Sequence, residues 1–483
     1  MTTDDRDVPI RTKIIATLGP ATDDPERLAA LFESGVDICR LNFSHGTAED
    51  HARRLQLVRR WAAEHDQPVA VIGDLCGPKI RLNPVRGEAF ELAPGDVVRF
   101  ARGDDDCTAD RLTTNFPTFV DELEVGHRIY IDDGLVRLLV TGHEGDVLTC
   151  TCTTGGRVSS RKGVNLPDTP LSTPALTAKD RQDLEWAIEH DLDYVALSFV
   201  RRPEDLNGLR TVIDKRESDI GVIVKIEKAE AIEHLDHLIS RADAVMVARG
   251  DLGVEMDVWR VPLMQKTITA RCRAVGKPVI VATQMLQSMV TSPMPTRAEV
   301  SDVANAILDG ADAVMLSAET AVGTYASVAV TMMDRVARAT ETYQRERHGL
   351  EPAPFVAEIS GTTAAIARAA VQAALQLDAC LVAVWTATGE TVRLLARHRL
   401  PIPVVGLSYN ERVCRRLNLL YGVIPLRVEP LSNPAEMARV LDARLLARQL
   451  ASPGDAIVVV TSTRPRTPGA TNTTLVHRVG DEL

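Results

Sequence analysis

Several features that would assign a protein to a class at once are missing from this sequence. No apolar run approaches the roughly 18 residues needed to cross a bilayer, and the polar stretch from Met1 to Asp7 lacks the apolar centre of a secretion signal. The eight cysteines include no CxxC pair, and Cys150 and Cys152 point to the same side of a predicted strand. We therefore expect a cytoplasmic protein without a membrane segment, whose cysteines are packed free thiols rather than a disulfide or zinc framework.

An excess of positive charge is also missing. The chain has 55 Lys and Arg residues against 66 Asp and Glu residues, which gives a formal net charge of -11. This balance argues against a general nucleic-acid or membrane-surface binder, although local basic sites could still hold an anionic substrate. The content of 45% hydrophobic and 25% charged residues is that of a soluble globular protein, and 483 residues predict two or three domains.

Short apolar runs with strand character alternate with longer helix-like stretches, such as 48–65 and 297–308. This alternation is typical of parallel strands joined by helical crossovers. Eight strands close a (β/α)8 TIM barrel, in which polar functional residues follow the carboxyl ends of the strands. The sequence predicts such a barrel, with strands at 14–19, 37–43, 69–75, 193–200, 221–227, 244–249, 279–283 and 313–319.

The alternation is interrupted by an insertion and followed by a further domain. Residues 78–174 contain short β-type runs joined by Gly and Asp turns, without a convincing helix, and predict an all-β lid inserted into the barrel. The barrel then comprises residues 1–77 and 175–343. After a proline-containing link at 351–354, residues 355–483 alternate helix and strand again, which predicts a C-terminal open α/β domain.

Two of the predicted strands end in ionisable residues, which a buried strand does not tolerate without partners. In V222-I-V-K-I-E-K228, the two-residue period places Lys225 and Glu227 on one face. The strand at 244–249 continues into Gly250 and Asp251, where glycine permits close approach to a ligand and Asp251 adds a second carboxylate. Two carboxylates without Cys or His favour a hard cation such as Mg2+. The alternative is a structural Lys–Glu pair beneath a turn.

Over essentially its whole length the chain resembles the pyruvate kinase family. The resemblance implies phosphoryl transfer between phosphoenolpyruvate and ADP, giving pyruvate and ATP, the final step of glycolysis. It also implies that the insertion is a lid over the nucleotide, that the last domain binds an effector, and that the protein is a homotetramer. The matching motifs, in family order and at similar separations, are T12-K-I-I-A-T-L-G-P20, R40-L-N-F-S-H-G46, G73-D-L-C-G-P-K-I-R81, K225-I-E227, A248-R-G-D-L-G-V-E255, A282-T-Q-M-L286 and the run PTRAEVSDVAN from Pro295 to Asn305.

The same resemblance implies roles for residues at the strand ends. Glu227 and Asp251 would hold Mg2+ or Mn2+, while Arg40 and Lys225 would face the transferring phosphoryl group. Positive charges on both sides of that group suit a reaction that depends on positioning and charge stabilisation. We expect Glu227 and Asp251 to be the only side chains that bind the divalent ion directly.

Further residues are implied for the substrate carboxylate, the proton and the nucleotide. Gly250, Asp251 and Thr283 would bind the carboxylate, and Gly250 and Asp251 could do so through backbone N–H groups. Thr283 and Ser317 would contribute to protonation of the enolate. Each could instead be a hydroxyl that only bonds to nearby backbone.

Arg81 at the lid hinge and Lys162 resemble nucleotide-phosphate contacts, although either could be an ordinary solvated basic residue. The sequence has Ala318 where the family commonly has glycine, and its Cβ would strain the loop if that position requires a positive φ.

The C-terminal domain contains a candidate site for a phosphorylated allosteric effector. A loop between a strand and a helix has the geometry in which free N–H groups favour an anion, and two arginines that follow the last strong strand could close over it. Sugar phosphates and AMP serve relatives, and Glu390 would repel a phosphate beside it. The candidate residues are Thr386, Thr388, Gly389, Thr391, Arg464 and Arg466.

The motif that begins at Asp74 departs from the pattern of relatives that require potassium. By similarity Asn42, Ser44 and Asp74, with a backbone carbonyl, would hold a monovalent cation. Lys79 stands where those relatives have glutamate, with Leu75 and Cys76 in place of their Thr and Lys. A tethered ammonium at this position could replace the mobile cation, so we predict that K+ is not required. The alternative is a solvated hinge lysine beside an intact ion site.

Two other functions remain open on the sequence. A Mg-dependent barrel lyase or aldolase acting through a pyruvate enolate would share the metal residues but would not need the lid. A catalytically silent sugar-phosphate sensor would have lost at least one residue of the set Lys225, Glu227, Asp251 and Thr283, and all four are present.

Overall fold

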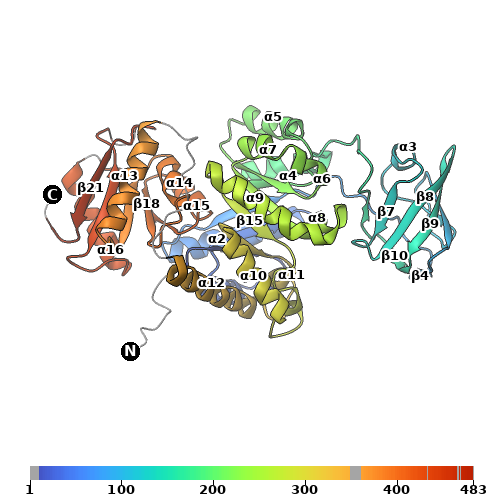
Figure 1. Ribbon diagram of the computed structural model, residues 1–483, viewed down its shortest axis with the longest axis horizontal. Helices are drawn as coiled ribbons and strands as arrows, with labels where there is room; N and C mark the ends of the chain where they lie inside the picture. Colours follow the sequence, from blue (N-terminus) through green and yellow to red (C-terminus); the bar gives the residue numbers. More distant parts are fainter. Residues whose placement is uncertain (1–9, 349–360, 432, 465–466, 468, 482–483) are drawn as a thin grey trace.

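The computed structural model describes residues 10–348, 361–431, 433–464, 467 and 469–481. Three bodies lie in a row, with the C-terminal α/β domain at one end, the barrel in the centre and the inserted β domain at the other end (Figure 1). The link predicted at 351–354 lies outside the described residues. None of the described helices combines the length and apolar character needed to cross a membrane.

The central body is a closed parallel barrel, as predicted. Its strands are joined in the order β1-β16-β15-β14-β13-β12-β3-β2. Nearly all strand residues are buried, because their side chains face either the barrel interior or the surrounding helices. The strands are β1 (Lys13–Thr17), β2 (Ile38–Asn42), β3 (Ala70–Asp74), β12 (Tyr194–Leu197), β13 (Gly221–Ile226), β14 (Ala244–Ala248), β15 (Val279–Ala282) and β16 (Ala313–Leu316).

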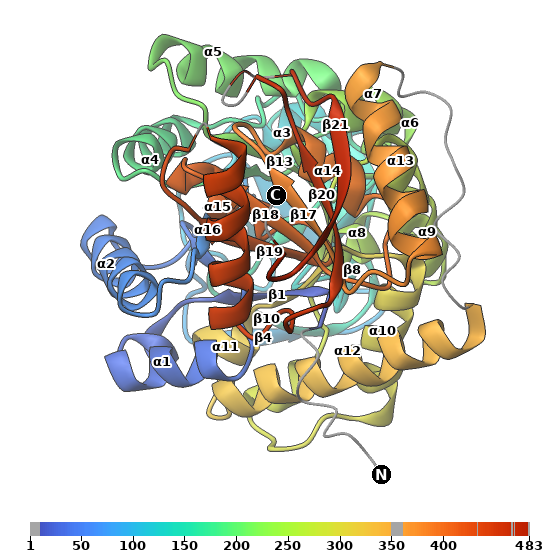
Figure 2. The same cartoon turned by 90° about the vertical axis from the view of Figure 1, so that its left-hand side faces the viewer.

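Helices surround the barrel, as the view along the long axis of the whole molecule shows (Figure 2). Four of them begin after a capping residue: the side chains of Asp24, Thr47, Thr177 and Thr296 accept backbone N–H groups of the first turn. The outer helices include α1 (Pro25–Glu33), α2 (Ala48–Glu64), α4 (Ala178–Glu189), α5 (Asn207–Lys215), α7 (Leu235–Arg241), α9 (Val261–Val275), α10 (Arg297–Asp309) and α12 (Ala326–His348).

An aspartate stands before several barrel strands and fastens the amino-terminal end of the barrel. Asp37, Asp193, Asp243 and Asp312 each accept a backbone N–H from the neighbouring strand, at 2.9, 2.8, 2.7 and 2.9 Å respectively. Each therefore satisfies a donor that the ladder would leave unpaired where the strands begin.

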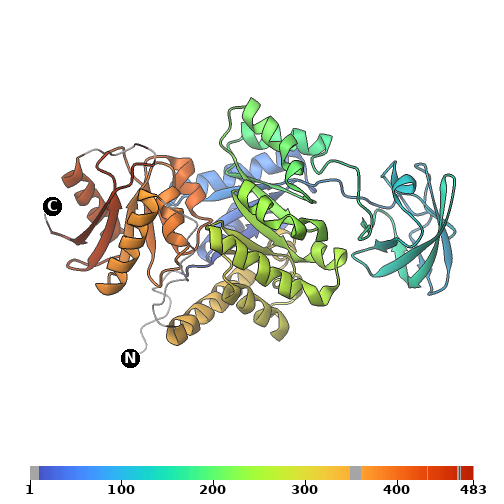
Figure 3. The same cartoon turned by 45° about the horizontal axis from the view of Figure 1, so that its top comes forward.

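The inserted domain projects from one end of the barrel in both side views (Figures 1 and 3) and contacts it through its base. It contains a two-stranded sheet and a six-stranded sheet around a core of its own, in which Cys150 and Cys152 are buried free thiols. The prediction of no helix was wrong by one turn, α3 (Phe119–Glu122), which is too short to give a helical period. The strands are β4 (Ala89–Leu92), β5 (Val97–Ala101), β6 (Arg111–Leu112), β7 (Arg128–Ile131), β8 (Val136–Glu144), β9 (Val147–Thr154), β10 (Gly156–Ser159) and β11 (Val164–Asn165).

The C-terminal domain is an open sheet in the order β19-β18-β17-β20-β21, in which only the β20–β21 pair is antiparallel. It lies against the amino-terminal end of the barrel, opposite the lid (Figure 1). Its elements are α13 (Thr362–Gln376), β17 (Leu381–Trp385), α14 (Glu390–Ala396), β18 (Val404–Ser408), α15 (Glu411–Leu417), β19 (Val423–Arg427), α16 (Pro434–Ala447), β20 (Ala456–Thr461) and β21 (Thr473–Arg478).

Candidate active site

Lys225, on β13, is the centre of a buried charge cluster at the carboxyl end of the barrel. Its Nζ lies 2.9 Å from Glu227 Oε1 and 3.1 Å from Asp74 Oδ1, and it donates to Ser198 Oγ at 2.7 Å. Burial alone would lower the pKa of Lys225, but the carboxylates of Asp74 and Glu227 raise it above its usual value. The ammonium is therefore charged at neutral pH, which matches the predicted role opposite a phosphoryl group.

Arg40 brings a second cation to the same carboxylate. Its Nε donates to Asp74 Oδ2 at 2.7 Å, and its Nη1 donates to Thr17 Oγ1 at 3.0 Å. Burial would raise the pKa of Asp74, but Lys225 and Arg40 together lower it. Asp74 Oδ1 accepts no hydrogen bond among the described residues, although Lys225 Nζ lies 3.1 Å from it as an ion-pair partner. Asp74 thus holds both Arg40 and Lys225 at the carboxyl end of the barrel.

The carboxylates predicted to hold a metal lie near one another. Glu227 is 1% exposed, and its Oε2 accepts the backbone N–H of Phe199 at 2.8 Å. Burial raises the pKa of Glu227, Lys225 opposes the rise, and the neighbouring charge of Asp251 adds to it. Two like charges held together in a buried site are a set of oxygen donors that fits a divalent cation. The described residues contain no group of three or more His, Cys, Asp and Glu side chains suited to a metal ion.

Phe199 was missed by the sequence analysis. It follows the end of β12 with a positive φ of 56°, in a conformation that L side chains rarely adopt. This backbone directs its N–H at Glu227, and a Cβ added to Gly77 at the lid hinge would lie 2.7 Å from the Phe199 ring. No apolar periodicity reports such a backbone conformation.

Thr283 also has a positive φ, of 70°. Its hydroxyl accepts the N–H of Gly250 at 2.7 Å, and its carbonyl accepts from Arg249 Nη2 at 2.8 Å. Arg249 is in turn paired at 2.7 Å with Asp302, which lies in the motif that runs from residue 295 to residue 305. Arg249 and Asp302, which belong to two of the sequence motifs, therefore hold Thr283 in its strained conformation. Its hydroxyl contacts Gly250, the residue before Asp251. The Gly250 N–H, predicted to meet the substrate carboxylate, is donated to Thr283 in this structure.

Ser317 lies at the start of the short helix α11 (Ala318–Ala321). Its N–H donates at 2.8 Å to Glu319, whose other oxygen accepts the N–H of Leu286 at 3.1 Å. Glu319 thereby ties the Ser317 turn to the segment that follows Thr283. The expected strain at Ala318 does not arise, because its φ is not positive and its Cβ occupies an ordinary helical position.

The two predicted nucleotide contacts lie together at the base of the lid. Arg81 is bridged to Gly163, and its Nη1 donates to the Arg161 carbonyl at 3.1 Å. Lys162 is half-buried and pairs with Asp132 at 2.8 Å. Both basic groups therefore lie on adjoining segments of the lid.

The residues predicted for a monovalent cation, or for its replacement, are also neighbours. Asn42 pairs with Asp74 in the β2–β3 register, and its Oδ1 accepts the N–H of Ser44 at 3.2 Å. Burial lowers the pKa of His45, which follows Ser44, and the charges of Arg81, Lys79 and Arg40 lower it further. The charge of Lys79 therefore acts on the loop that contains Ser44 and His45. The Asp74 carboxylate is paired with Arg40 and Lys225.

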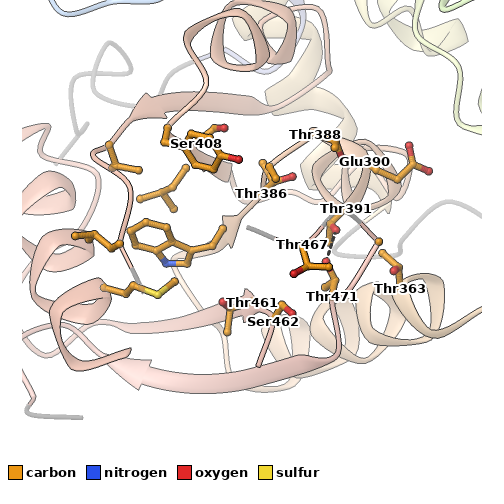
Figure 4. Close-up of a pocket in the computed structure, with 18 of the residues that line it drawn as sticks. Thr363, Thr386, Thr388, Glu390, Thr391, Ser408, Thr461, Ser462, Thr467 and Thr471 are labelled. Carbon is orange, nitrogen blue, oxygen red and sulfur yellow. Dashed lines mark hydrogen bonds between the residues drawn. The ribbon is translucent and has the colours of Figure 1, made fainter. Parts of the chain in front are cut away.

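Three of the candidate effector residues line a pocket in the C-terminal domain (Figure 4). Thr386, Thr388 and Thr391 border it together. Gly389, with φ of 86°, begins α14 and donates its N–H to Thr386 Oγ1 at 2.8 Å.

The two arginines predicted to close over this pocket are not among its described lining residues. Arg464 is exposed and is not a lining residue, and Arg466 lies outside the described residues. Glu390 borders the pocket and pairs with Arg393 at 2.6 Å, and Glu429 adds a second carboxylate. The described lining includes no Lys, Arg or His.

The fold and the site together define a class of protein. A TIM barrel that gathers Arg40, Lys225 and two buried carboxylates at the carboxyl ends of its strands is typical of a barrel enzyme that acts on an anionic substrate.

The comparisons specify the family. Residues 10–330 match the family model for the barrel domain of pyruvate kinase, and residues 364–477 match that for its alpha/beta domain. The chain is 42% identical over 472 residues to a pyruvate kinase of Mycobacterium intracellulare, covering 98% of this chain and 99% of that protein. It is 43% identical over 473 residues to one from Methylorubrum extorquens, covering 96% of each.

A crystal structure of a pyruvate kinase from Cryptosporidium parvum is similar with a TM-score of 0.91 at 31% identity, covering 99% of this chain and 98% of that one. The chain belongs to the pyruvate kinase family. The barrel, the inserted lid and the C-terminal domain therefore agree with the resemblance found in the sequence.

Proposed function

We propose that this protein transfers the phosphoryl group of phosphoenolpyruvate to ADP, giving pyruvate and ATP, with Mg2+ or Mn2+ as cofactor. The observation that carries the proposal is the cluster in which Lys225 lies within 3.1 Å of both Asp74 and Glu227, with Arg40 on the other side of Asp74. The carboxylates of Asp74 and Glu227 raise the pKa of Lys225, and Asp74 holds Arg40 and Lys225 at the same end of the barrel. A divalent ion held by Glu227 and Asp251 would neutralise oxygens of the phosphoryl group and of the enolate.

Within this reaction the side chains have separate tasks. Arg40 and Lys225 orient the phosphoryl group and offset its charge while it is between donor and acceptor oxygens. Arg81 and Lys162 bring the nucleotide phosphates to it when the lid approaches. Thr283, whose hydroxyl faces Gly250, stands beside the carboxylate position and can pass a proton toward the enolate carbon.

Ser317 would complete that relay. Its backbone N–H is held by Glu319, so its hydroxyl can orient toward Thr283. The loss of either hydroxyl should therefore affect protonation of the enolate more than phosphoryl transfer.

A coupled assay tests the function. Purified protein is given phosphoenolpyruvate, ADP and Mg2+, and pyruvate is detected with lactate dehydrogenase and NADH. The proposal expects pyruvate formation that requires ADP. A barrel lyase or aldolase would act on its substrate without ADP, and a silent sensor would form no pyruvate, so either result would overturn the proposal.

We also propose that the enzyme does not require potassium. Lys79 is half-buried and close enough to the Asn42–His45 loop to lower the pKa of His45. A unit charge at ~4 Å and an effective dielectric constant of ~20 interacts by roughly 4 kcal/mol, which is about a thousandfold in rate if it acts only in the transition state. Asn42, Ser44 and Asp74 are retained, so an intact ion site is the competing explanation.

The potassium proposal is tested in tetramethylammonium buffer free of K+ and NH4+, to which KCl is added at constant ionic strength. The wild type should be fully active without K+. Lys79→Glu should lose most activity and recover part of it only with K+. Strong activation of the wild type by K+ would show that the ion site is used and that Lys79 does not replace the ion.

A phosphorylated effector is proposed for the C-terminal pocket. Three threonine hydroxyls and the start of α14 offer donors to an anion. Because the described lining holds Glu390 and Glu429 and no Lys, Arg or His, a cation for the phosphate would have to come from a residue outside that lining. Calorimetry with fructose bisphosphate, glucose phosphate and AMP should find one that binds the wild type but not Thr388→Glu. If one binds both proteins equally, its site lies elsewhere.

A homotetramer is proposed on the same family basis. Val258, Trp259 and Leu263 are 68%, 71% and 61% exposed, near the start of α9, which is unusual for large apolar side chains so close in sequence. Light scattering with sedimentation should give a mass near four chains, and Trp259→Glu should lower it. A cytoplasmic location is an expectation that fractionation of the source cells would test.

A further inference from the structure

A buried ion pair, Lys228–Glu255, lies close to the two proposed metal carboxylates in the chain and in the structure. Lys228 Nζ is 2.8 Å from Glu255 Oε1, and the side chains are 9% and 3% exposed. Both residues border the same cleft as Asp251, between the barrel and the base of the lid. The roles proposed above for catalysis and substrate binding use neither residue.

The pair connects the two chain segments that carry the carboxylates. Lys228 immediately follows Glu227 at the end of β13. Glu255 ends α8 (Arg249–Glu255) and lies four residues after Asp251, so the two share one face of that helix. A bond between Lys228 and Glu255 therefore limits how far Glu227 and Asp251 can move apart.

The cost of burying two charges means that such a pair is weak evidence of a contribution to stability. Partners behind the ligands of a metal commonly orient those ligands, and their removal weakens metal binding by about 10 to 100-fold. The position of this pair, one residue from one carboxylate and one helical turn from the other, fits that task.

The lid contacts the same carboxylate. Asn165, on β11, donates from Nδ2 to Glu255 Oε1 at 2.9 Å. Glu255 Oε1 thus accepts from the barrel, through Lys228, and from the lid, through Asn165.

We propose that Lys228 and Glu255 are positioning residues that set the separation of Glu227 and Asp251 for the divalent ion, and that Asn165 ties the lid to this pair. The proposal rests on the proposed function, because it takes Glu227 and Asp251 as the metal ligands. It assigns to Lys228 and Glu255 no contact with the ion or the substrates.

The test measures Mn2+ binding without turnover. Free Mn2+ is followed by electron paramagnetic resonance as full-length protein is titrated, with no substrate present. Lys228→Met and Glu255→Gln should each weaken Mn2+ binding by about 10-fold or more. Lys228→Arg, which keeps the charge, should recover part of the loss, and a purely structural role would not produce this pattern in a folded protein.

A matched control is available at the other end of the barrel. Lys13 and Asp37 also form a largely buried pair, at 3.2 Å, far from the carboxylates. Lys13→Met makes the same chemical change and should leave Mn2+ binding unaltered. If Lys13→Met weakens binding as much as Lys228→Met, the effect is general destabilisation and the proposal is wrong.

The lid connection is measured separately. Asn165→Leu should raise the KM for ADP several-fold and leave Mn2+ binding to the free protein unchanged, because only the link from the lid is lost. An unchanged KM would remove Asn165 from the proposal.

Asp251→Asn separates failure of this inference from failure of the proposed function. If Asp251→Asn abolishes Mn2+ binding while Lys228→Met and Glu255→Gln bind normally, the metal site is right and the positioning role is wrong. If Asp251→Asn binds Mn2+ normally, the proposed metal site itself is wrong.

Discussion

The two ends of the barrel both concentrate charge, but they use it differently. At the amino-terminal end, Asp193 is fully buried between Arg415 of the C-terminal domain, at 2.7 Å, and Arg59 of α2, at 3.1 Å. Its remaining capacity is taken by the N–H of Val71. At the carboxyl end, Asp74 is as well buried but keeps an oxygen without a hydrogen bond among the described residues.

The difference shows how a structural cluster can be told from a functional one. Where both oxygens of a buried carboxylate are taken by the protein, as at Asp193, the charge connects elements and has no capacity for a ligand. Where the charge of Asp251 helps to raise the pKa of Glu227, and Asp74 Oδ1 accepts no hydrogen bond among the described residues, the site has capacity for a partner that the chain does not supply. Substitutions at the first end should therefore change stability, and substitutions at the second end should change activity.

The largest expected effect is at the carboxyl end. Lys225→Met should lower kcat by about a thousandfold, roughly 4 kcal/mol, because its charge is needed most while the phosphoryl group is in transit. The KM for phosphoenolpyruvate should change far less. Steady-state kinetics in the coupled assay measure both values, and urea unfolding checks that the variant remains folded. A variant with normal turnover would contradict the role of Lys225.

The opposite result is expected at the amino-terminal end. Arg415→Met leaves Asp193 buried without its main partner, which should cost about 3 to 5 kcal/mol of stability. The C-terminal domain should separate from the barrel at a lower urea concentration, while kcat at 20 °C stays within about twofold of the wild type, because the site is at the far ends of the strands. Equilibrium unfolding followed by tryptophan fluorescence checks the first expectation. If Arg415→Met lowered kcat as strongly as it lowered stability, the proposed difference between the two ends of the barrel would be wrong.

Much of the carboxyl end could be predicted from sequence for a physical reason. Lys225 and Glu227 interrupt an apolar strand, so their presence requires partners that the local sequence does not contain. Asp193 carries no such signal, because an aspartate between a helix and a strand looks like an ordinary turn residue. Its meaning depends on Arg415, 222 residues away in the chain.

Elements of the C-terminal domain were missed for related reasons. β19 contains Pro425, which argues against a strand unless the strand is at an edge, as β19 is. β21 is half polar because it is the opposite edge of the sheet. The start of α16 could have been found, since Asn433 caps it and Pro434 occupies its first turn. The positive φ of Phe199 could not have been predicted, because the sequence around a bulky residue gives no sign of an unusual backbone conformation.

The smallest effect is expected from His398, in the C-terminal domain, and only in acid. His398 is 8% exposed; burial, together with the charges of Arg397 and Arg368, lowers its pKa from 6.5 to about 4. The folded state therefore binds fewer protons than the unfolded state between these values, so stability is complete above pH 6.5 and falls as the pH drops toward 4.

The contribution of His398 to the pH dependence of the free energy of unfolding can be measured separately. Between pH 7.5 and pH 5 the loss should be about 2 kcal/mol, because about 1.5 pKa units separate pH 5 from the unfolded value and each is worth about 1.4 kcal/mol. Urea unfolding of the wild type and of His398→Asn at both pH values measures the difference. The variant should lose correspondingly less stability on acidification, while His237→Asn, a change at an exposed histidine of α7, should behave as the wild type does. If His398→Asn and the wild type lose equal stability on acidification, His398 is not the source of the pH dependence and the prediction is wrong.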